Sequence, residues 1–450
     1  MRRQETERSG EPNRIDQRGK GLKMLGPAFQ VDDSIRGIPI GTAPLEAQFV
    51  PDRGWSVSAG DLAYPVLTVS ESAYRSNRNA IFNYAAAHGA LLAPHIKTPM
   101  SIDIAHDLIS AGAWGVSVAN LQQASVMLRG GITQLLFANQ LGGEKSGQQL
   151  GLLLAMYSDA ECVLFVDSME SLAAANRAGE VARRPLPVLV EVGLGRAGLR
   201  TVEQAQAVIE KAMLYEHVEL KGVASYEGAV ASADPVATFE AIGRLNDLTA
   251  WVFSSVRQAM PGAHLLLSSG GSQYFDLVVQ ALSPLITSDG NTDLVLRSGA
   301  IFFHDHGVYA RAVERMDERR GFALDDDNIS AARLFQPAMR VWAEALSRPE
   351  SDLVICGIGM RDVSFDQDFP VPLRAWRDGI CIATLSYAAK IEKLNDQHGF
   401  LRVSEDMDIK VGDLVEFGIS HPCTCFDRWR YFFVIDEEHR VTSIHQTFFG

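Results

Sequence analysis

The sequence predicts an α/β protein in which a (β/α)8 barrel is followed by a smaller, mostly antiparallel β domain. Between residues 91 and 299, eight apolar runs alternate with segments of helical periodicity. Near-continuous apolar strands that alternate with helices indicate a parallel sheet covered on both faces. Eight such units fit a closed barrel, and an open doubly wound sheet is the alternative. After about residue 310, short β-like runs separated by turn residues replace this alternation.

The predicted elements of the barrel follow in a regular order. A short strand at 65–69 and a helix at 72–88 precede the first repeat. The eight barrel strands are expected at 91–97, 115–120, 134–139, 162–167, 187–193, 220–225, 264–270 and 294–299. The helices between them are expected at 101–111, 121–128, 148–157, 168–178, 201–214, 234–260 and 272–281.

The rest of the chain divides by composition. Residues 1–25 are polar, carry charges of both signs and lack the apolar core of a secretory signal, so a disordered leader is predicted. Residues 26–60 are rich in proline and glycine and are expected to be loop-like and to pack on the β domain. The barrel is assigned to 61–310 and the β domain to 311–450. Within the β domain, a helix is expected at 329–347, and strands at 352–356, 380–385, 399–403, 414–419, 431–434 and 441–445.

The overall composition is that of a soluble globular protein, with 47% hydrophobic and 21% charged residues among 450. The net charge is −14, from 41 basic and 55 acidic residues, which argues against nucleic acid or an anionic membrane as partner. The longest apolar stretch, 151–166, is too short to span a membrane and is interrupted by Asp159 and Glu161. Five scattered cysteines, an odd number, favour free thiols in a reducing, cytoplasmic location.

Lys97 ends the first barrel strand, and a helical pattern begins a few residues later. A lysine at the carboxyl end of a buried strand lies on the face where such barrels place their chemistry. Partial desolvation lowers the pKa of its amine, which makes it a nucleophile or a Schiff-base former. The alternative is a lysine that only reaches from a strand end to solvent.

A Ser-Ser-Gly-Gly-Ser run at 268–272 lies between the seventh strand and the following helix. Its glycines allow backbone N–H groups to approach a phosphate, and the helix N-terminus adds partial positive charge. The Arg-Ser-Gly run at 297–299, after the eighth strand, could complete this anion site. A Schiff-base lysine and a phosphate site on one face of a barrel predict pyridoxal phosphate as cofactor. Tyr226 and Arg196 could contact the cofactor ring; the alternatives are packing for Tyr226 and a surface ion pair for Arg196.

The β domain contains a second candidate site in the His-Pro-Cys-Thr-Cys run at 421–425. In an extended segment, His421 and Cys423 would point to the same face. Imidazole and thiolate together favour zinc, and two ligands suit a catalytic Zn²⁺ completed by water or substrate. Cys425 and His398 are further ligand candidates, and the sequence leaves their participation open.

Taken together, these motifs resemble a known family. They are Pro-His-Ile-Lys-Thr at 94–98, Glu-Val-Gly-Leu-Gly-Arg-Ala-Gly at 191–198, Ser-Gly-Gly at 269–271, Arg-Ser-Gly at 297–299 and His-Pro-Cys-Thr-x-Phe-Asp-Arg-Trp at 421–429. Their order resembles the D-threonine aldolase and D-serine dehydratase family of fold-type III, alanine racemase-like pyridoxal phosphate enzymes. The wording around the lysine is similar to bacterial sequences called D-amino acid deaminases. Gly193 replaces an aspartate of the family, and Ile301 replaces a tyrosine.

The resemblance implies an alanine racemase-type barrel with a β domain, usually as a homodimer. It implies that Lys97 carries pyridoxal phosphate and that His421 and Cys423 hold Zn²⁺. The residues expected at the cofactor are His95, Lys97, Arg196, Tyr226, Ser269, Gly270, Gly271, Ser272 and Gly299.

The expected activity is a zinc-assisted elimination on a D-β-hydroxy amino acid such as D-serine or D-threonine, which yields a 2-oxo acid and ammonia. The His-x-Cys pair is the ligand set that the resemblance associates with the dehydratase branch, whereas the aldolase branch more often has His-x-Asp. The alternative is a retro-aldol cleavage to glycine and an aldehyde on the same site. A more remote alternative is a pyridoxal phosphate-binding protein without turnover.

Overall fold

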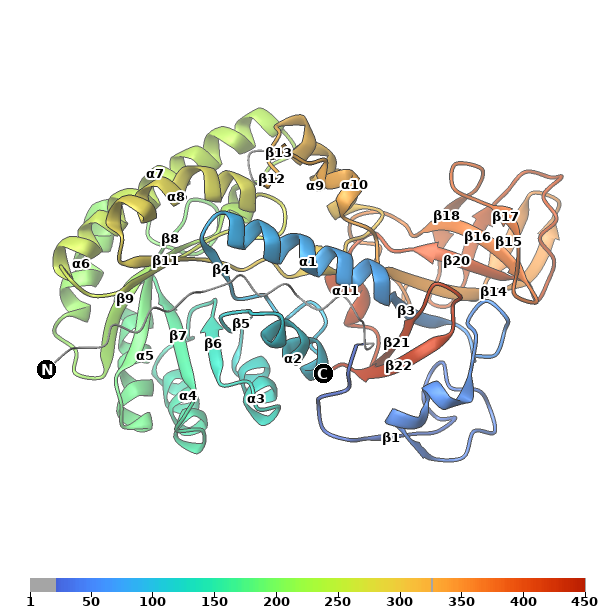
Figure 1. Cartoon of the computed structure of the whole chain (residues 1–450), viewed down its shortest axis with the longest axis horizontal. Coiled ribbons are helices and arrows are strands. Elements are labelled where there is room, and N and C mark those ends of the chain that lie inside the picture. Colours follow the sequence, from blue (N-terminus) through green and yellow to red (C-terminus); the bar gives the residue numbers. More distant parts are fainter. Residues whose placement is uncertain (1–21, 325–326, 450) are drawn as a thin grey trace, which may run out of the picture.

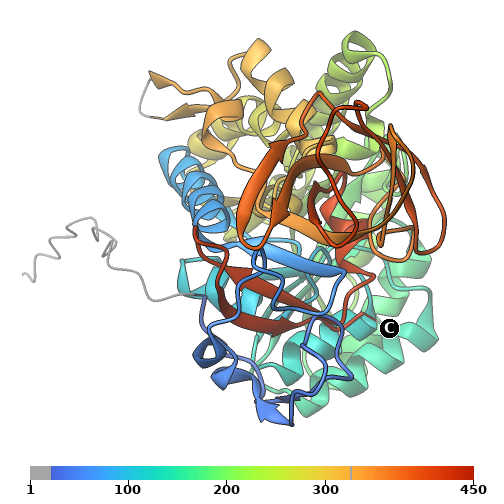
Figure 2. The same cartoon turned by 90° about the vertical axis from the view of Figure 1, so that its right-hand side faces the viewer.

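The structure is a computed structural model that describes residues 22–324 and 327–449. It consists of a barrel surrounded by helices and an antiparallel sheet beside it (Figure 1). Viewed from the side of that sheet, the antiparallel strands lie in front of the barrel (Figure 2). Residues 1–21 of the predicted leader lie outside the described residues.

The predicted parallel barrel is confirmed. Its strands are β4 (Ala90–Leu92), β5 (Val116–Val118), β6 (Gln134–Phe137), β7 (Glu161–Val166), β8 (Leu186–Val192), β9 (Val218–Ser225), β10 (Leu265–Ser268) and β11 (Thr292–Leu296). Among the described residues they form one parallel sheet in the order β4-β11-β10-β9-β8-β7-β6-β5. The gap between β4 and β5 is bridged by a parallel pair, His95 with Ser117. This near-closed sheet excludes the open doubly wound alternative.

Helices follow the strands as the periodicity predicts. They are α1 (Glu71–Ala87), α2 (Ile102–Ser110), α3 (Leu121–Arg129), α4 (Glu144–Met156), α5 (Met169–Ala182), α6 (Val202–Ala212), α7 (Pro235–Ala259), α8 (Phe275–Asp289) and α9 (Val308–Glu318). Their starts carry the expected caps: Asn120, Thr201 and Asp234 each accept an N–H from the first turn of the helix that follows. A short hairpin, β12 (Ala323–Leu324) with β13 (Asp327–Asn328), follows α9.

Apolar side chains fill the barrel and the space around it. The inside holds side chains from successive strands, such as Leu136, Val163, Leu189 and Leu266. Such an interior is a packed core, so chemistry is confined to the ends of the strands.

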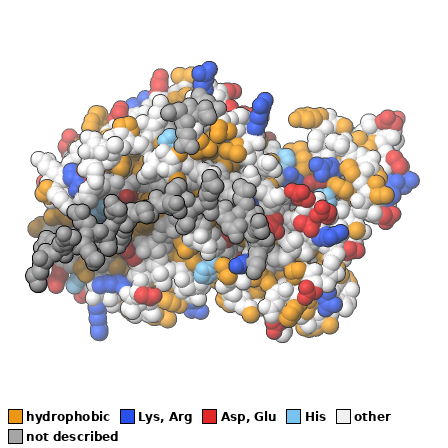
Figure 3. Space-filling model, viewed as in Figure 1, with side chains coloured by type: hydrophobic (Ala, Val, Ile, Leu, Met, Phe, Trp, Pro, Cys, Tyr) orange, Lys and Arg blue, Asp and Glu red, His pale blue; other side chains and the backbone are white. Residues whose placement is uncertain are grey.

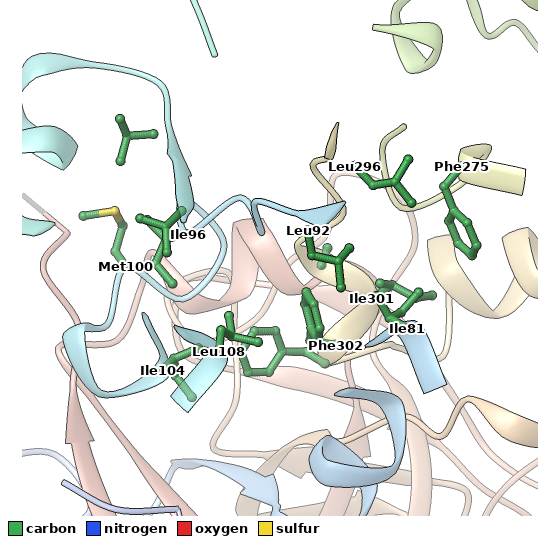
Figure 4. Close-up of a cluster of buried hydrophobic side chains, with 14 of the residues drawn as sticks. Ile81, Leu92, Ile96, Met100, Ile104, Leu108, Phe275, Leu296, Ile301 and Phe302 are labelled. Carbon is green, nitrogen blue, oxygen red and sulfur yellow. The ribbon is translucent and has the colours of Figure 1, made fainter. Parts of the chain in front are cut away.

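A second layer lies between the barrel and its outer helices (Figure 4). There Leu92 of β4 packs close to Phe302, and Ile96 and Met100 belong to the same cluster. Ile96 and Met100 are both buried, and they anchor the turn that carries Lys97.

The second domain is a ten-stranded sheet. Its strands are β3 (Val66–Ser70), β14 (Met339–Glu350), β15 (Leu353–Cys356), β16 (Val371–Arg377), β17 (Ile380–Thr384), β18 (Lys390–Leu394), β19 (Gly399–Arg402), β20 (Leu414–Gly418), β21 (Tyr431–Ile435) and β22 (Val441–Gln446). The early strand β3 pairs antiparallel with β14 and parallel with β21. The chain therefore enters the barrel from a strand of this sheet.

One predicted helix is wrong. The region 329–347 forms only a short helix, α10 (Ala331–Leu334), and then becomes the long strand β14. Residues 341–343 of that strand are buried on both faces of the sheet, and from Ala343 the burial alternates, with Ala345 buried and Glu344 and Leu346 exposed, which is the period of a strand. The strands β16 and β18 were not expected, because their exposed sides carry charged residues that mask the apolar pattern.

The segment before β3 lies under the antiparallel sheet. It contains β1 (Gln30–Val31), β2 (Leu45–Glu46) and two 3-10 turns, Ala47–Phe49 and Pro51–Arg53. Its apolar side chains, including Ile38 and Val50, join a cluster with Trp342 and Phe433 of the sheet.

Acidic and basic side chains are interspersed on the face shown in Figure 3. Across the two described ranges, we find no helix that combines the length and apolar character of a membrane span.

Candidate active site

A cavity of about 460 Å³ lies at the carboxyl ends of the barrel strands. The short helix α11 (Pro422–Phe426) of the second domain forms its other wall, at the junction seen in Figure 1. The lining residues are His95, Lys97, Thr98, Ala119, Ala138, Asn139, Phe165, Glu191, Arg196, Tyr226, Gly271, Ser272, Arg297, Gly299, Ala300, Tyr309, His421 and Cys423. The residues expected at the cofactor are all among them except Ser269 and Gly270, and so are the expected metal ligands His421 and Cys423. The further ligand candidates Cys425 and His398 are not.

Lys97 extends into this cavity from the turn after β4. Its neighbours Ile96 and Thr98 are both 1% exposed, so the backbone is held while the lysine side chain faces the open space. Burial lowers the pKa of the Lys97 amine, and the Arg196 and Arg297 charges lower it further, against the opposing effect of Cys423. A lowered pKa leaves more of the amine uncharged at neutral pH and therefore nucleophilic.

His95 lies beside Lys97 where the barrel closes. Burial, together with the charges of Lys97 and Arg297, holds the pKa of its ring well below the ordinary value, so the imidazole is neutral. Its Nδ1 is buried without a hydrogen-bond partner. Buried polar atoms are normally paired, so this ring nitrogen leaves room for a polar ligand.

The loops after β10 and β11 form the wall where the sequence predicted an anion site. The Ser272 hydroxyl oxygen accepts the Gly299 N–H at 3.1 Å and the Ile301 N–H at 3.3 Å, which ties the two loops together. A Cβ at Gly299 would lie 2.5 Å from the His95 carbonyl oxygen, so only glycine allows this approach.

A buried carboxylate changes the expected use of the glycine loop. Glu227, in the 3-10 turn Glu227–Val230 after β9, accepts the Gly270 N–H at 3.1 Å and the Gly271 N–H at 2.6 Å. These two N–H groups are therefore directed to the protein itself. Ser269 and Gly270 lie behind the cavity wall, and the Ser269 hydroxyl oxygen accepts a hydrogen bond from Ser225 at 3.0 Å.

Two arginines and a tyrosine surround the central part of the cavity. The Arg196 guanidinium lies 5.2 Å from the centre of the Tyr226 ring, so it stacks on an aromatic face. Arg297 is buried and donates to the Ser268 hydroxyl at 2.8 Å and to the Ser225 carbonyl at 2.6 Å. Of the three, Arg297 is held in place by the barrel, while Arg196 and Tyr226 present their surfaces to the cavity.

Several lining residues were not identified from the sequence. Phe165 is the residue before the last of β7 and Tyr309 lies in the first turn of α9, and neither belongs to a recognisable motif. Glu191 is the residue before the last of β8 and accepts a hydrogen bond from Gln140. Burial raises the pKa of Glu191, and the Gln140 hydrogen bond opposes this shift. Glu191 begins one of the motifs quoted above, but the motif assigned it no role of its own.

The His421 and Cys423 side chains reach the cavity from the second domain. The expectation of an extended segment is wrong: His421 caps α11, and Cys423 lies inside its first turn. Burial opposes protonation of His421, but Cys423 and Asp366 raise the pKa of its ring to about 9. A metal ion held there must displace this proton.

The helical backbone also decides the role of Cys425. Two residues in a helix turn the side chain by about 200°, so Cys425 faces away from Cys423. Its thiol is buried 3.8 Å from the Asp362 carbonyl oxygen. His398 lies in the hairpin between β18 and β19 and is not part of the cavity lining. Within the described part of the chain, no group of three or more metal-binding side chains converges. The His421 imidazole and the Cys423 thiol are the lining side chains whose chemistry suits Zn²⁺.

Comparison with known families and curated proteins agrees with this architecture. Residues 69–278 match the alanine racemase N-terminal domain, and residues 338–435 match a putative serine dehydratase domain. A 3-hydroxy-D-aspartate aldolase from Paracoccus denitrificans is 24% identical over 373 residues, which cover 80% of this chain and 85% of that protein. A D-threonine aldolase from an Arthrobacter species is 24% identical over 347 residues, covering 75% and 80%.

Solved structures share the fold. D-threonine aldolase from Filomicrobium marinum superposes with a TM-score of 0.71 at 22% identity, covering 88% of this chain and 97% of that one. D-threo-3-hydroxyaspartate dehydratase from Delftia sp. HT23 superposes with a TM-score of 0.65 at 18% identity, covering 87% and 99%. Variants of a D-threo-3-hydroxyaspartate dehydratase that lack a histidine, or a cysteine two residues later, are also known, and the cysteine variant is in a metal-free form.

Proposed function

We propose that this chain, which belongs to the fold-type III, alanine racemase-like family of pyridoxal phosphate enzymes, is a metal-assisted D-β-hydroxy amino acid dehydratase. A D-threonine aldolase and a 3-hydroxy-D-aspartate aldolase are among its relatives. It would remove the β-hydroxyl group of its substrate and release a 2-oxo acid and ammonia. One observation carries the proposal: Lys97 and the His421–Cys423 pair open onto the same cavity from two different domains.

Lys97 is the residue that would hold pyridoxal phosphate, whose ring stabilises negative charge at the substrate Cα when bound. The structure fits this role, because a reactive amine, the unpartnered Nδ1 of His95 and a glycine-walled space share one cavity. With the cofactor and substrate bound, Lys97 would be the group that removes the Cα proton as a general base. Its lowered pKa matches that task.

His421 and Cys423 would hold a Zn²⁺ ion, which would act as a Lewis acid toward the β-hydroxyl group. Support comes from the same spacing in the related dehydratase, where a histidine and a cysteine two residues apart have been replaced and the cysteine variant is metal-free. Thr98, next to Lys97, has its hydroxyl 3.3 Å from the Cys423 sulfur. This contact positions the thiol against the lysine turn.

The second candidate function is a retro-aldol cleavage to glycine and an aldehyde. It is favoured by the curated relatives, which are aldolases. Both reactions begin with the same substrate, and they differ in whether the Cα proton or the β-hydroxyl proton is removed. The thiol ligand Cys423 favours elimination, because it matches the dehydratase pattern.

The deciding experiment supplies the purified full chain with pyridoxal phosphate, Zn²⁺ and D-threonine and identifies the products. Elimination yields 2-oxobutanoate and ammonia, whereas retro-aldol cleavage yields glycine and acetaldehyde. D-serine and 3-hydroxy-D-aspartate are tested in the same way. Cofactor binding without turnover of any of the three substrates would favour a non-catalytic binding protein.

Two variants assign the roles. Lys97→Ala is expected to abolish turnover and to remove the absorbance of the lysine-bound cofactor. Cys423→Ala is expected to abolish turnover but to leave that absorbance intact. Cys381→Ala is the matched control, because Cys381 is a free, exposed thiol in β17, outside the cavity.

A further inference from the structure

A loop of the second domain holds the His-Pro-Cys-Thr segment through its side chains. The Asp366 Oδ2 lies 2.8 Å from the His421 Nδ1, and the Asp366 Oδ1 accepts the Thr424 hydroxyl at 2.6 Å. One carboxylate therefore binds the residue before α11 and a residue inside it. Neither contact was foreseen, because more than fifty residues separate the partners in the sequence.

Hydrogen bonds around this carboxylate hold the loop itself in place. The Ser364 hydroxyl oxygen accepts the backbone N–H of His421 at 3.1 Å, and it lies 3.2 Å from the Ser420 hydroxyl. Ser420 in turn donates to the Asp368 carbonyl at 2.7 Å. Residues 364–368 are thus joined to residues 420–424 by these three contacts as well as by the two from Asp366, which holds the backbone that carries Asp366 beside His421.

The contact decides which ring nitrogen of His421 is free. An ionised carboxylate only accepts hydrogen bonds, so the Nδ1 must carry a proton and donate it to Asp366. The Nε2 is then the nitrogen that a metal ion could bind, once the metal displaces the proton from it. Since His421 lines the cavity together with Cys423, the imidazole and the thiol belong to the same wall.

We propose that Asp366 is the positioning residue of the metal site, because it fixes the ring orientation and the tautomer in which His421 can bind a metal ion. The inference rests on the metal role given to His421 and Cys423 above. Histidine ligands usually donate their second ring N–H to such a carboxylate, and replacing it costs about 10- to 100-fold in metal affinity. Thr424 supports Asp366 by occupying its other oxygen.

The test measures Zn²⁺ affinity of the full chain with pyridoxal phosphate bound, by competition with a chromophoric chelator. Asp366→Ala is expected to weaken Zn²⁺ binding about 10- to 100-fold, while cofactor absorbance and thermal unfolding stay unchanged. Asp366→Glu is expected to recover part of the affinity, since it restores the acceptor. Thr424→Val is expected to weaken binding less than Asp366→Ala does.

Asp368→Asn is the matched control. Asp368 lies in the same loop with a comparable charge, but it pairs with Arg311 at 2.7 Å, away from His421. This variant should bind Zn²⁺ like the wild type. If the wild type binds Zn²⁺ and Asp366→Ala binds it equally well, the positioning role is overturned while the proposed function stands. If the wild type binds no Zn²⁺, both the metal role and this inference are overturned.

Discussion

Two aspartate–histidine pairs in this protein have the same nitrogen–oxygen distance but differ in their exposure to solvent. His421 Nδ1 lies 2.8 Å from Asp366, and His445 Nδ1 lies 2.8 Å from Asp103. The His421 and Asp366 side chains are 20% and 39% exposed, while those of His445 and Asp103 are 0% and 6% exposed. The first pair borders a cavity, and the second lies in the core.

The difference lies in the second ring nitrogen. In His445 the Nε2 lies 2.7 Å from the Ser443 hydroxyl, so both ring nitrogens are occupied. Asp103 is equally saturated, because it accepts the backbone N–H groups of Leu25 and Gly26 at 2.6 Å each. This Ser–His–Asp line resembles a hydrolytic triad in order, but its serine is only 5% exposed, so no substrate can reach it. The His445–Asp103 pair, with both ring nitrogens bonded inside the core, ties segments together. His421 instead lines the cavity beside Cys423, and its second nitrogen can bind a ligand once the proton on it is displaced.

The largest expected effect is a loss of activity when the cavity-lining pair, His421–Asp366 (the open pair), is changed. His421→Ala should reduce turnover of the active D-hydroxy amino acid by about 10³-fold or more, because Lewis-acid stabilisation by a metal ion contributes several kcal/mol. Initial rates with and without added Zn²⁺ measure this loss. The unfolding free energy of the metal-free variant should change little. His398→Ala is the control, because His398 is an exposed histidine outside the cavity. An equal loss of turnover in this variant would contradict the role given to His421.

The buried pair, His445–Asp103 (the closed pair), should affect stability and leave metal binding unchanged. His445→Ala should lower the free energy of unfolding by about 3 kcal/mol, since it leaves a buried carboxylate without its partner. Urea unfolding of the purified variant measures this difference. Zn²⁺ affinity of the folded fraction is expected to match the wild type. A variant with normal stability and impaired metal binding would reverse the roles assigned to the two pairs.

Acid should act on the closed pair through Asp103. Burial alone would raise the pKa of Asp103, but the hydrogen bond and charge of His445 and the N–H groups of Gly26 and Leu25 lower it below its ordinary value. A carboxyl group with a lowered pKa stabilises the folded state above its unfolded pKa of about 3.9. This contribution is lost as the pH falls through the folded value. Asp103→Asn should therefore be less stable than the wild type at pH 7, and the difference should shrink below about pH 4, as followed by urea unfolding at each pH.

The smallest expected effect is on stability at the open pair. Asp366→Asn in the metal-free protein should change the unfolding free energy by less than about 1 kcal/mol, because a partly exposed ion pair contributes little. Urea unfolding in the presence of a chelator tests this value. A loss comparable with that of His445→Ala would mean that the Asp366 contact is mainly structural, and the comparison between the two pairs would fail.

Much of the site could be located from the sequence because a barrel brings its strand ends together whatever the details of packing. Counting strands from Lys97 was enough to place Tyr226, Ser272 and Gly299 on the same rim. The strand count could not predict which partner each polar group at the rim binds. It assigned free N–H groups to Gly270 and Gly271, since the sequence could not show that Glu227 would take both of them.

The sequence by itself determined the barrel, its succeeding β domain and the lysine, glycine-loop and His-x-Cys motifs, because apolar periodicity and local spacing are properties of neighbouring residues. Only the tertiary structure decided that β3 belongs to the second sheet, that α11 turns Cys425 away from the cavity and that Asp366 contacts His421. It also decided that the His445–Asp103 pair is buried in the core and that the His421–Asp366 pair borders the cavity. Those outcomes depend on contacts between segments far apart in the chain, where burial and the number of available partners set the chemistry of each side chain.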